Sequence, residues 1–274
     1  MHGISYFAIT LDERIKHSMD TKAILIIAAL IVIFLLETVF PHYRGRRDRV
    51  KHGLPHVITA LLNSLITKFA LVLVTIAVIE WGKTNSIGLT HMLSLSPTAE
   101  LIIVFLFFDI WMYFWHRANH NFGFLWRFHR AHHSDTEMDT TTALRFHPGE
   151  LVLSTFFRLP IVLLLGMSLG QLVLFEVLLN ISTLFHHSNL AVPEKWDRLL
   201  RTIIVTPNMH RVHHSIEQFE TNSNYTSLLS VWDRLFGSFR TRKDTLTITI
   251  GLPVFREMNY QRLWGFLVTP FRPG

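Results

Sequence analysis

Long apolar runs are the feature that most constrains how this chain of 274 residues can fold. Residues 23–40, 57–81 and 99–115 approach the about 20 residues that a helix needs to cross the hydrocarbon core of a bilayer. A further run, 151–185, is broken at 166–170 and is long enough for a helical hairpin. Lipid offers no partners to backbone polar groups, so a spanning segment must satisfy them within a helix or a closed barrel. The sequence therefore predicts an all-α integral membrane helical bundle of about four transmembrane helices, including the hairpin.

Composition and charge agree with contact to lipid. The chain is 49% hydrophobic and 17% charged, whereas about 25% charged residues is usual in soluble domains. Much of the formal charge of +6 lies in the loop 41–52, which contains one acidic residue, while the loop 82–98 has only Lys83. The basic residues of the first loop are Arg44, Arg46, Arg47, Arg49 and Lys51. Such loops stay in the cytoplasm, so the charge is interpreted as a topology signal and no nucleic-acid partner is expected.

Ten clustered histidines predict a metal centre. They occur at helical spacing, in which positions i, i+3 and i+4 share one face. The clusters are His116 and His120; His129, His132 and His133; His186 and His187; and His210, His213 and His214. The predicted topology brings all four to the cytoplasmic face. Neutral imidazole is the commonest nitrogen ligand for transition metals, and this number of ligands exceeds what one ion accepts. Two metal ions are therefore predicted; polar residues that merely mark a membrane interface would instead mix lysine and arginine at irregular spacing.

The absence of cysteine restricts the chemistry further. It excludes disulfides, thiolate zinc sites, Fe-S ligation and a cysteine nucleophile within this chain, so any metal must be bound by nitrogen and oxygen. The spacing alone does not identify the element, because zinc, copper and iron all bind imidazole.

Other polar and aromatic residues are candidates for supporting roles. Isolated histidines are interpreted as ordinary surface or core residues: His2, His17, His42, His52, His56 and His91. Candidates for orienting the ligand N–H groups, as metal-bound imidazoles commonly require, are Glu137, Asp139, Asn180 and Asn208. His147 is a candidate for a site role or for the polar start of a helix at Pro148. The aromatic residues between 111 and 128 are expected to line a route for lipid or to form an interfacial belt.

The segments outside the apolar runs carry weaker signals. Thr206 and Pro207 predict an N-cap and first turn, and hence a helix that presents the last histidine cluster. Residues 225–236 predict an amphipathic helix, residues 245–251 alternate like a short strand, and residues 260–274 are typical of an interfacial segment. The first 22 residues mix acidic and basic side chains, unlike the start of a cleaved signal peptide.

The order of the histidine motifs resembles a known family. His-x3-His from 116, His-x2-His-His from 129, the HHSN stretch from 186 and His-x2-His-His from 210 are similar to the fatty acid hydroxylase / sterol desaturase superfamily of membrane di-iron oxygenases. The similarity extends over residues 109–239. Within that superfamily, the residue patterns FWHRANHNFGFLWRFHRAHHS and TTALRFHPGE are most similar to those of the branch that contains alkylglycerol monooxygenase and its bacterial relatives.

This resemblance implies a function and a ligand set. It implies a four-helix membrane base with a cytoplasmic cap, two iron ions, O2 as co-substrate and hydroxylation or desaturation of a lipid C–H bond; zinc could replace iron in a purified protein. The implied ligands are His116, His120, His129, His132, His133, His187, His210, His213 and His214. In the HHSN stretch, the usual ligand is the histidine directly before Ser188, which is His187. Its neighbour His186 is included as an additional candidate. Some relatives have a further ligand where this chain has Thr183, which implies fewer ligands at one metal.

Electrons for such a reaction must come from outside, because the chain has no nucleotide-binding glycine motif, haem motif or Fe-S cysteines. A reductase, ferredoxin, cytochrome b5 or pterin is the expected donor. We expect a single domain, 1–274, made of N-terminal transmembrane helices (1–115), a first cap segment (116–148), a transmembrane hairpin (149–187) and a C-terminal cap (188–274). The lack of a cytochrome b5 domain and of a dilysine signal favours a bacterial inner membrane.

Two other classes of function remain open at this stage. A metal transporter would place its ligands near the middle of the bilayer, often in broken helices. A zinc-dependent membrane hydrolase would need fewer ligands and a placed general base, such as the glutamate of an HExxH helix, which is absent.

Overall fold

The computed structural model describes the backbone of residues 2–45 and 48–274, and the side chains of those ranges from residue 20 onward. The described chain is helical and contains only isolated β-bridges. Five helical segments are long and apolar enough to cross a membrane, where about four were expected. They are Asp20–Val39, Arg49–Met92, Pro97–Asn121, Pro148–Leu165 and Leu169–His187. The predicted all-α integral membrane bundle is confirmed. Arg46 and Arg47 of the basic loop, and the side chains of His2 and His17, lie outside the described residues.

The long helices form the membrane base. They are α1 (His2–Val39), α2 (Arg49–Ile66), α3 (Val72–Thr84), α5 (Pro97–Asn121), α7 (Pro148–Leu165) and α8 (Leu169–His187). A π-helical turn, Thr67–Leu71, joins α2 to α3, and α4 (Leu89–Met92) precedes α5. The predicted hairpin is α7 and α8, which meet at Gly166 with a φ of +70°. A Cβ at Gly166 would lie 2.4 Å from Thr90 Oγ1, so this turn requires glycine.

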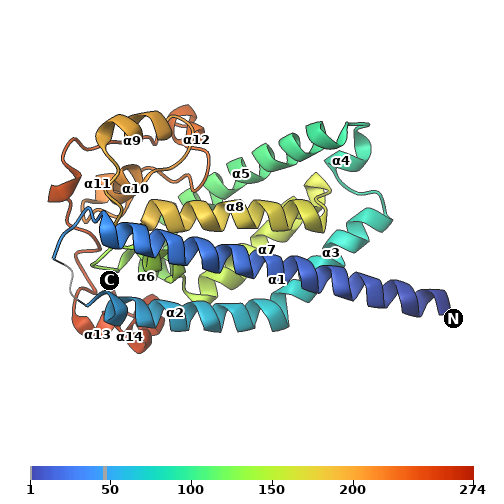
Figure 1. The fold of residues 1–274 in the computed structure, drawn as a ribbon, viewed down its shortest axis with the longest axis horizontal. Helices are drawn as coiled ribbons and strands as arrows, with labels where there is room; N and C mark the ends of the chain where they lie inside the picture. The colour runs from blue at the N-terminus through green and yellow to red at the C-terminus, as the bar shows by residue number, and fades with distance from the viewer. Residues whose placement is uncertain (1, 46–47) are drawn as a thin grey trace.

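The cap gathers at the end of the bundle where the C-terminus lies (Figure 1). Its helices are α6 (Gly123–His133), α9 (Glu194–Leu200), α10 (Pro207–His213), α11 (Gln218–Thr221), α12 (Val231–Leu235), α13 (Met258–Gln261) and α14 (Leu263–Val268). Short 3-10 turns occupy Thr140–Leu144, Thr245–Thr247 and Thr269–Phe271. Because α5 and α8 both end here, their last turns face the cap.

Apolar packing within the bundle holds α5, α7 and α8 together. Phe108 of α5, Val162 of α7 and Phe175 of α8 are almost fully buried in one cluster. The rings of Phe108 and Phe175 meet edge to face at a centroid distance of 4.7 Å. Large apolar side chains such as Leu35 and Phe69 are exposed on the outside, as expected for a surface that faces lipid.

The prediction of a strand at 245–251 is wrong. Thr245–Thr247 is a 3-10 turn, and within the described part of the chain the only β-pairing of this segment is an isolated bridge between Ser215 and Ile250. Asp244 accepts a hydrogen bond from the backbone N–H of Leu246 and so starts the turn. The alternation arises because Ile248 and Ile250 reach one small apolar cluster, and no neighbouring strand is present among the described residues to extend the pairing.

The predicted helix at 225–236 is too long. Only Val231–Leu235 is helical, because the Asp233 carboxylate accepts hydrogen bonds from the backbone N–H groups of Tyr225 and Thr226 at 2.8 and 3.1 Å. These bonds hold the preceding residues in a turn rather than a helix. The helix predicted after Thr206 is confirmed as α10, with Thr206 Oγ1 accepting from the Met209 N–H at 3.3 Å.

Candidate metal centre

The histidine clusters meet in two groups at the junction of the bundle and the cap. The five-histidine group comprises His116, His120, His129, His133 and His213. The four-histidine group comprises His132, His187, His210 and His214. Within each group, one ring nitrogen from every member lies within 4.8 Å of the others. All members are buried except the half-buried His116 and His120. Segments far apart in the sequence therefore offer two adjacent sets of nitrogen ligands.

Helical geometry explains how each His-x2-His-His motif serves both groups. On α6, positions i and i+4 (His129 and His133) face the five-histidine group and position i+3 (His132) faces the other. The second copy reverses this assignment, because His210 and His214 face the four-histidine group and His213 faces the five-histidine group. Positions i and i+4 share a helix face and position i+3 is displaced around it. Each of the two His-x2-His-His motifs thus contributes histidines to both groups.

In three rings, a hydrogen bond at Nδ1, the outer nitrogen that faces away from the group, determines which nitrogen carries the proton. Nδ1 of His116, His187 and His213 lies 2.6, 2.8 and 2.6 Å from the backbone carbonyls of Tyr225, Thr183 and Ser223, respectively. A carbonyl only accepts, so each Nδ1 must donate, and each neutral ring therefore has a lone pair on Nε2.

These unprotonated Nε2 atoms point toward one another. Nε2 of His116 lies 3.1 Å from Nε2 of His213, and also 3.1 Å from Nε2 of His129, whose Nδ1 donates to a carboxylate. Nε2 of His187 lies 3.0 Å from that of His132, whose Nδ1 faces the Arg145 carbonyl. Facing lone pairs at this distance repel unless a cation lies between them. Neither ring nitrogen of the buried His214 has a hydrogen-bond partner. The donor set therefore fits imidazole-bound metal ions.

Burial keeps the cap histidines neutral. Desolvation, reinforced by the neighbouring imidazoles, lowers the pKa of His132, His133, His210 and His214 well below the usual value. Desolvation also lowers the pKa of His213 to about 3, against hydrogen bonds that raise it. Neutral imidazole is the form that binds metals, so these rings do not need to lose a proton near neutral pH.

Several predicted supporting residues lie elsewhere. His186 is in neither group, although its ring lies 4.1 Å from that of His210, centroid to centroid. His147 caps α7, because its Nδ1 accepts from the Gly149 N–H and its Nε2 contacts the Leu267 carbonyl. Four predicted orienting residues make no hydrogen bond to either group: Glu137, Asp139, Asn180 and Asn208. Their proximity in sequence was misleading, because the outer partners are mainly backbone carbonyls.

One outer partner that the sequence analysis missed is a carboxylate. Glu150 Oε1 accepts from His129 Nδ1 at 2.7 Å, and Glu150 is only 5% exposed. The available signal was its position in the RFHPGE stretch, in the first turn of the helix that begins at Pro148.

A third cluster does not have free metal ligands. His52 and His56, interpreted as isolated, lie together beside Asp135. Both ring nitrogens of His52 face carboxylates, at 2.8 Å from Asp135 and 3.1 Å from Asp139, so both must donate. His56 Nε2 lies 3.1 Å from the Arg145 guanidinium, which only donates, so its lone pair is already used. This cluster is a hydrogen-bond network beside the His-x2-His-His motif at 129–133.

Comparison with known proteins supports the assignment of a family. The "Fatty acid hydroxylase" family model matches residues 101–238, half of this chain. The chain is 32% identical over 155 residues to alkylglycerol monooxygenase of Danio rerio, covering 56% of this chain and 33% of that protein. It is 29% identical over 157 residues to ornithine lipid hydroxylase OlsE of Rhizobium tropici, covering 56% and 45% of the two chains. With sphingolipid C4-hydroxylase sur2 of Schizosaccharomyces pombe the identity is 30% over 149 residues, covering 54% and 50%.

The matches thus span about a third to a half of the length of these relatives. No solved structure matches the chain. The family match covers α5 to α12, the segments that contain both histidine groups. This membrane-spanning chain belongs to the fatty acid hydroxylase family.

Proposed function

We propose that this chain is an iron-dependent lipid hydroxylase of the membrane, in which the two histidine groups each bind one iron. The observation that carries the proposal is the convergence of unprotonated Nε2 atoms from four separated segments. The reaction would take R–H, O2, two electrons and two protons to R–OH and water. The three relatives described above are named as hydroxylases or monooxygenases. Their names favour hydroxylation over desaturation.

The bound irons would supply the reduction of O2 and the oxidation of the C–H bond. The chain itself supplies placement. The carbonyls of Tyr225, Thr183 and Ser223 fix which ring nitrogen faces inward, and burial of the cap histidines keeps water from the ligands. The electron donor is a separate component: a reductase, ferredoxin, cytochrome b5 or pterin. The position of the groups at the ends of α5 and α8, rather than at their centres, argues against metal transport.

Lipid extracts test this function directly. Cells that express the chain should accumulate a lipid heavier by one oxygen atom than its counterpart in cells that lack it, when the extracts are compared by mass spectrometry. Growth in 18O2 should place the heavy isotope in that product. Uptake of metal by cells without any altered lipid would instead support a transporter.

We also propose that the metal centre lies on the cytoplasmic side of a bacterial inner membrane. The support is the excess of basic residues in 41–52, among which Lys51 lies in the first turn of α2. That turn is at the same end of the bundle as the centre, whereas α3, which ends just after Lys83, runs to the other end (Figure 1). The chain has no cysteine, so single substitutions report topology cleanly. In intact spheroplasts, a membrane-impermeant maleimide should label Lys83→Cys, and it should label Lys51→Cys only after lysis. The reverse pattern would contradict this orientation.

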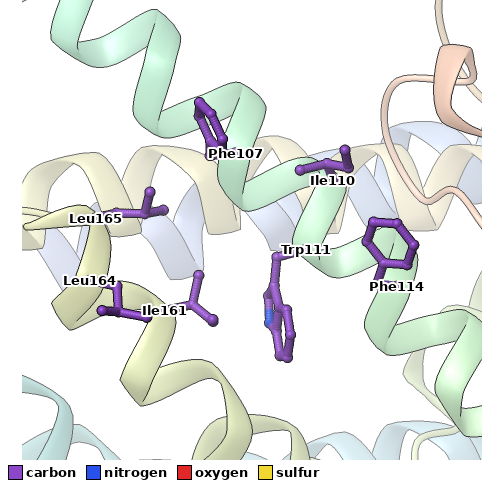
Figure 2. A pocket seen from close by; sticks show the side chains of 7 residues that line it. All are labelled: Phe107, Ile110, Trp111, Phe114, Ile161, Leu164 and Leu165. Carbon is purple, nitrogen blue, oxygen red and sulfur yellow. The ribbon is translucent and has the colours of Figure 1, made fainter. Parts of the chain in front are cut away.

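The groove between α5 and α7 is the proposed place for the alkyl chain of the substrate. Its volume is about 270 Å³, and its lining is apolar: Phe107, Ile110, Trp111, Phe114, Ile161, Leu164 and Leu165 (Figure 2). Phe114 lies two residues before His116, so the groove ends within one turn of α5 of the five-histidine group. Within a membrane span, a hydrocarbon chain is the ligand that such a lining accepts.

Narrowing this groove should shorten the lipids that are oxidised. Ile161→Trp is expected to reduce products with the longest chains about tenfold or more relative to shorter ones, the scale on which apolar pockets discriminate methylene groups. The measurement is the chain-length profile of the oxygenated lipids. Leu73→Trp is the control, because Leu73 is 69% exposed on α3 outside the groove. An unchanged profile with Ile161→Trp would place the chain elsewhere.

A further inference from the structure

The two histidine groups differ in the residues that support them from outside. The outer nitrogens of His116, His132, His187 and His213 face backbone carbonyls. His129 alone faces a carboxylate: among the described residues, Glu150 is the only acidic side chain that accepts a hydrogen bond from either group. A carboxylate accepts more strongly than a carbonyl and makes the imidazole a more basic ligand.

The surroundings of Glu150 keep its charge directed at His129. Glu150 is 5% exposed, and its second oxygen, Oε2, is buried without a hydrogen-bond partner. Among the described residues, no other donor therefore competes for the carboxylate. Glu150 also lies in the first turn of α7, where the N-terminal end of an 18-residue helix favours a negative side chain.

His129 has a central place in its own group. Its Nε2 lies 3.1 Å from Nε2 of both His116 and His133. Any change in the strength of His129 Nε2 as an electron donor therefore acts on the ion that these three rings would share. The four-histidine group has one ligand fewer. Two of its four members, His210 and His214, have no partner at Nδ1 among the described residues, whereas His120 is the member of the five-histidine group in that state.

We propose that Glu150 is a positioning residue that makes the two metal sites inequivalent. Through His129 it strengthens the five-histidine group, which then binds its ion more tightly than the four-histidine group. The inference rests on the proposed dimetal centre but not on any particular lipid. It gives the fold two distinct ions: one firmly held, and one in a poorer ligand set with more room for an exogenous ligand.

The test is anaerobic titration of the purified, metal-free protein in detergent with ⁵⁷Fe²⁺, followed by Mössbauer spectroscopy. The wild type should fill two sites in sequence. Glu150→Gln, which keeps the shape and removes the charge, should weaken the first site about 10- to 100-fold, as loss of an outer partner does, and leave the second site and its spectrum unchanged. His214→Ala, which removes a ligand of the four-histidine group, identifies the spectrum of that site.

Glu100→Gln is the matched control. Glu100 is also in the first turn of a spanning helix and accepts a hydrogen bond from Gln171 Nε2 at 2.7 Å, but it contacts neither group. Equal weakening of both sites by Glu150→Gln, or no weakening, would overturn the inference. If Glu150→Gln fails to fold, Glu150→Asp is titrated instead: loss confined to the first site supports the inference, and equal loss refutes it. Failure of the wild type to bind two irons would refute the dimetal centre itself.

Discussion

Replacing His129 by alanine is expected to abolish lipid oxygenation and to remove one of two bound irons. His129 Nε2 meets the rings of both His116 and His133 at 3.1 Å, so its loss takes the central ligand from the five-histidine group. It also leaves the buried carboxylate of Glu150 without its partner. The activity should fall by more than the about 100-fold that loss of an outer partner causes. Mass spectrometry of lipid extracts measures the product, and metal analysis of the purified protein measures the iron.

The number of irons is the sharper part of this prediction. The four-histidine group does not include His129, so one ion should remain. His91→Ala is the control, because His91 is exposed in α4, at the end of the bundle away from the cap. Full activity of His129→Ala would contradict the assignment of His129 as a ligand. Loss of both ions with the fold intact would instead indicate one coupled site.

Helical periodicity made the convergence of the histidines predictable. The spacing within each motif determines which face a histidine occupies, and the positive-inside rule brought all motifs to one end of the bundle. Both inferences use only local sequence and charge. The structure brings nine of the ten predicted histidines into two groups and leaves His186 beside them.

The partners of those ligands were not predictable in the same way. Tyr225 and Ser223 contribute carbonyl oxygens, which any residue type would provide, so their side chains carry no signal. The segment that begins at Tyr225 is not the helix that its apolar spacing indicated, because the Asp233 carboxylate accepts a hydrogen bond from the backbone N–H of Tyr225. Glu150 is 21 positions from His129 and meets it only because α6 and α7 pack together. Tertiary contacts of this kind override local pattern.

The same limit applies to the isolated histidines. His52 and His56 are 79 and more residues from the segment that they contact, and nothing in their spacing predicts it. Their partners, Asp135 and Thr141, belong to the stretch that follows the His-x2-His-His motif at 129–133. The network therefore ties α2 to the base of the metal centre, through side chains whose role depends on the packing of the whole cap.

Arg145 is the residue of this network whose loss should destabilise the protein most. Its guanidinium contacts the carbonyls of Ala131 and Tyr260 at 3.2 and 3.0 Å, and it also donates to Ser134 Oγ and His56 Nε2 at 3.0 and 3.1 Å. Arg145 is 1% exposed. These bonds join α2, the end of α6 and α13. Arg145→Met keeps the volume of the side chain and removes all of them.

The expected cost is about 3 kcal/mol or more in the free energy of unfolding, because hydrogen bonds to charged groups contribute about 1.5–3 kcal/mol each and buried carbonyls are left unpaired. At roughly 2–4 °C per kcal/mol for a chain of this size class, the melting temperature in detergent should fall by roughly 6–12 °C. Thermal denaturation followed by circular dichroism, with and without a chelator, measures it.

The matched control for Arg145→Met is Arg198→Met, since the Arg198 side chain is 74% exposed and its ion pair with Glu194 is long, at 3.6 Å. That change should alter stability by less than about 0.5 kcal/mol. The chelator arm separates two causes of instability. If Arg145 acts through the packing of the cap, the difference between Arg145→Met and the wild type persists in the metal-free protein. If it acts only by supporting metal binding, the difference disappears there. Equal melting temperatures of Arg145→Met and the wild type in both conditions would show that the hydrogen-bond network beside the motif at 129–133 contributes little to the stability of the fold.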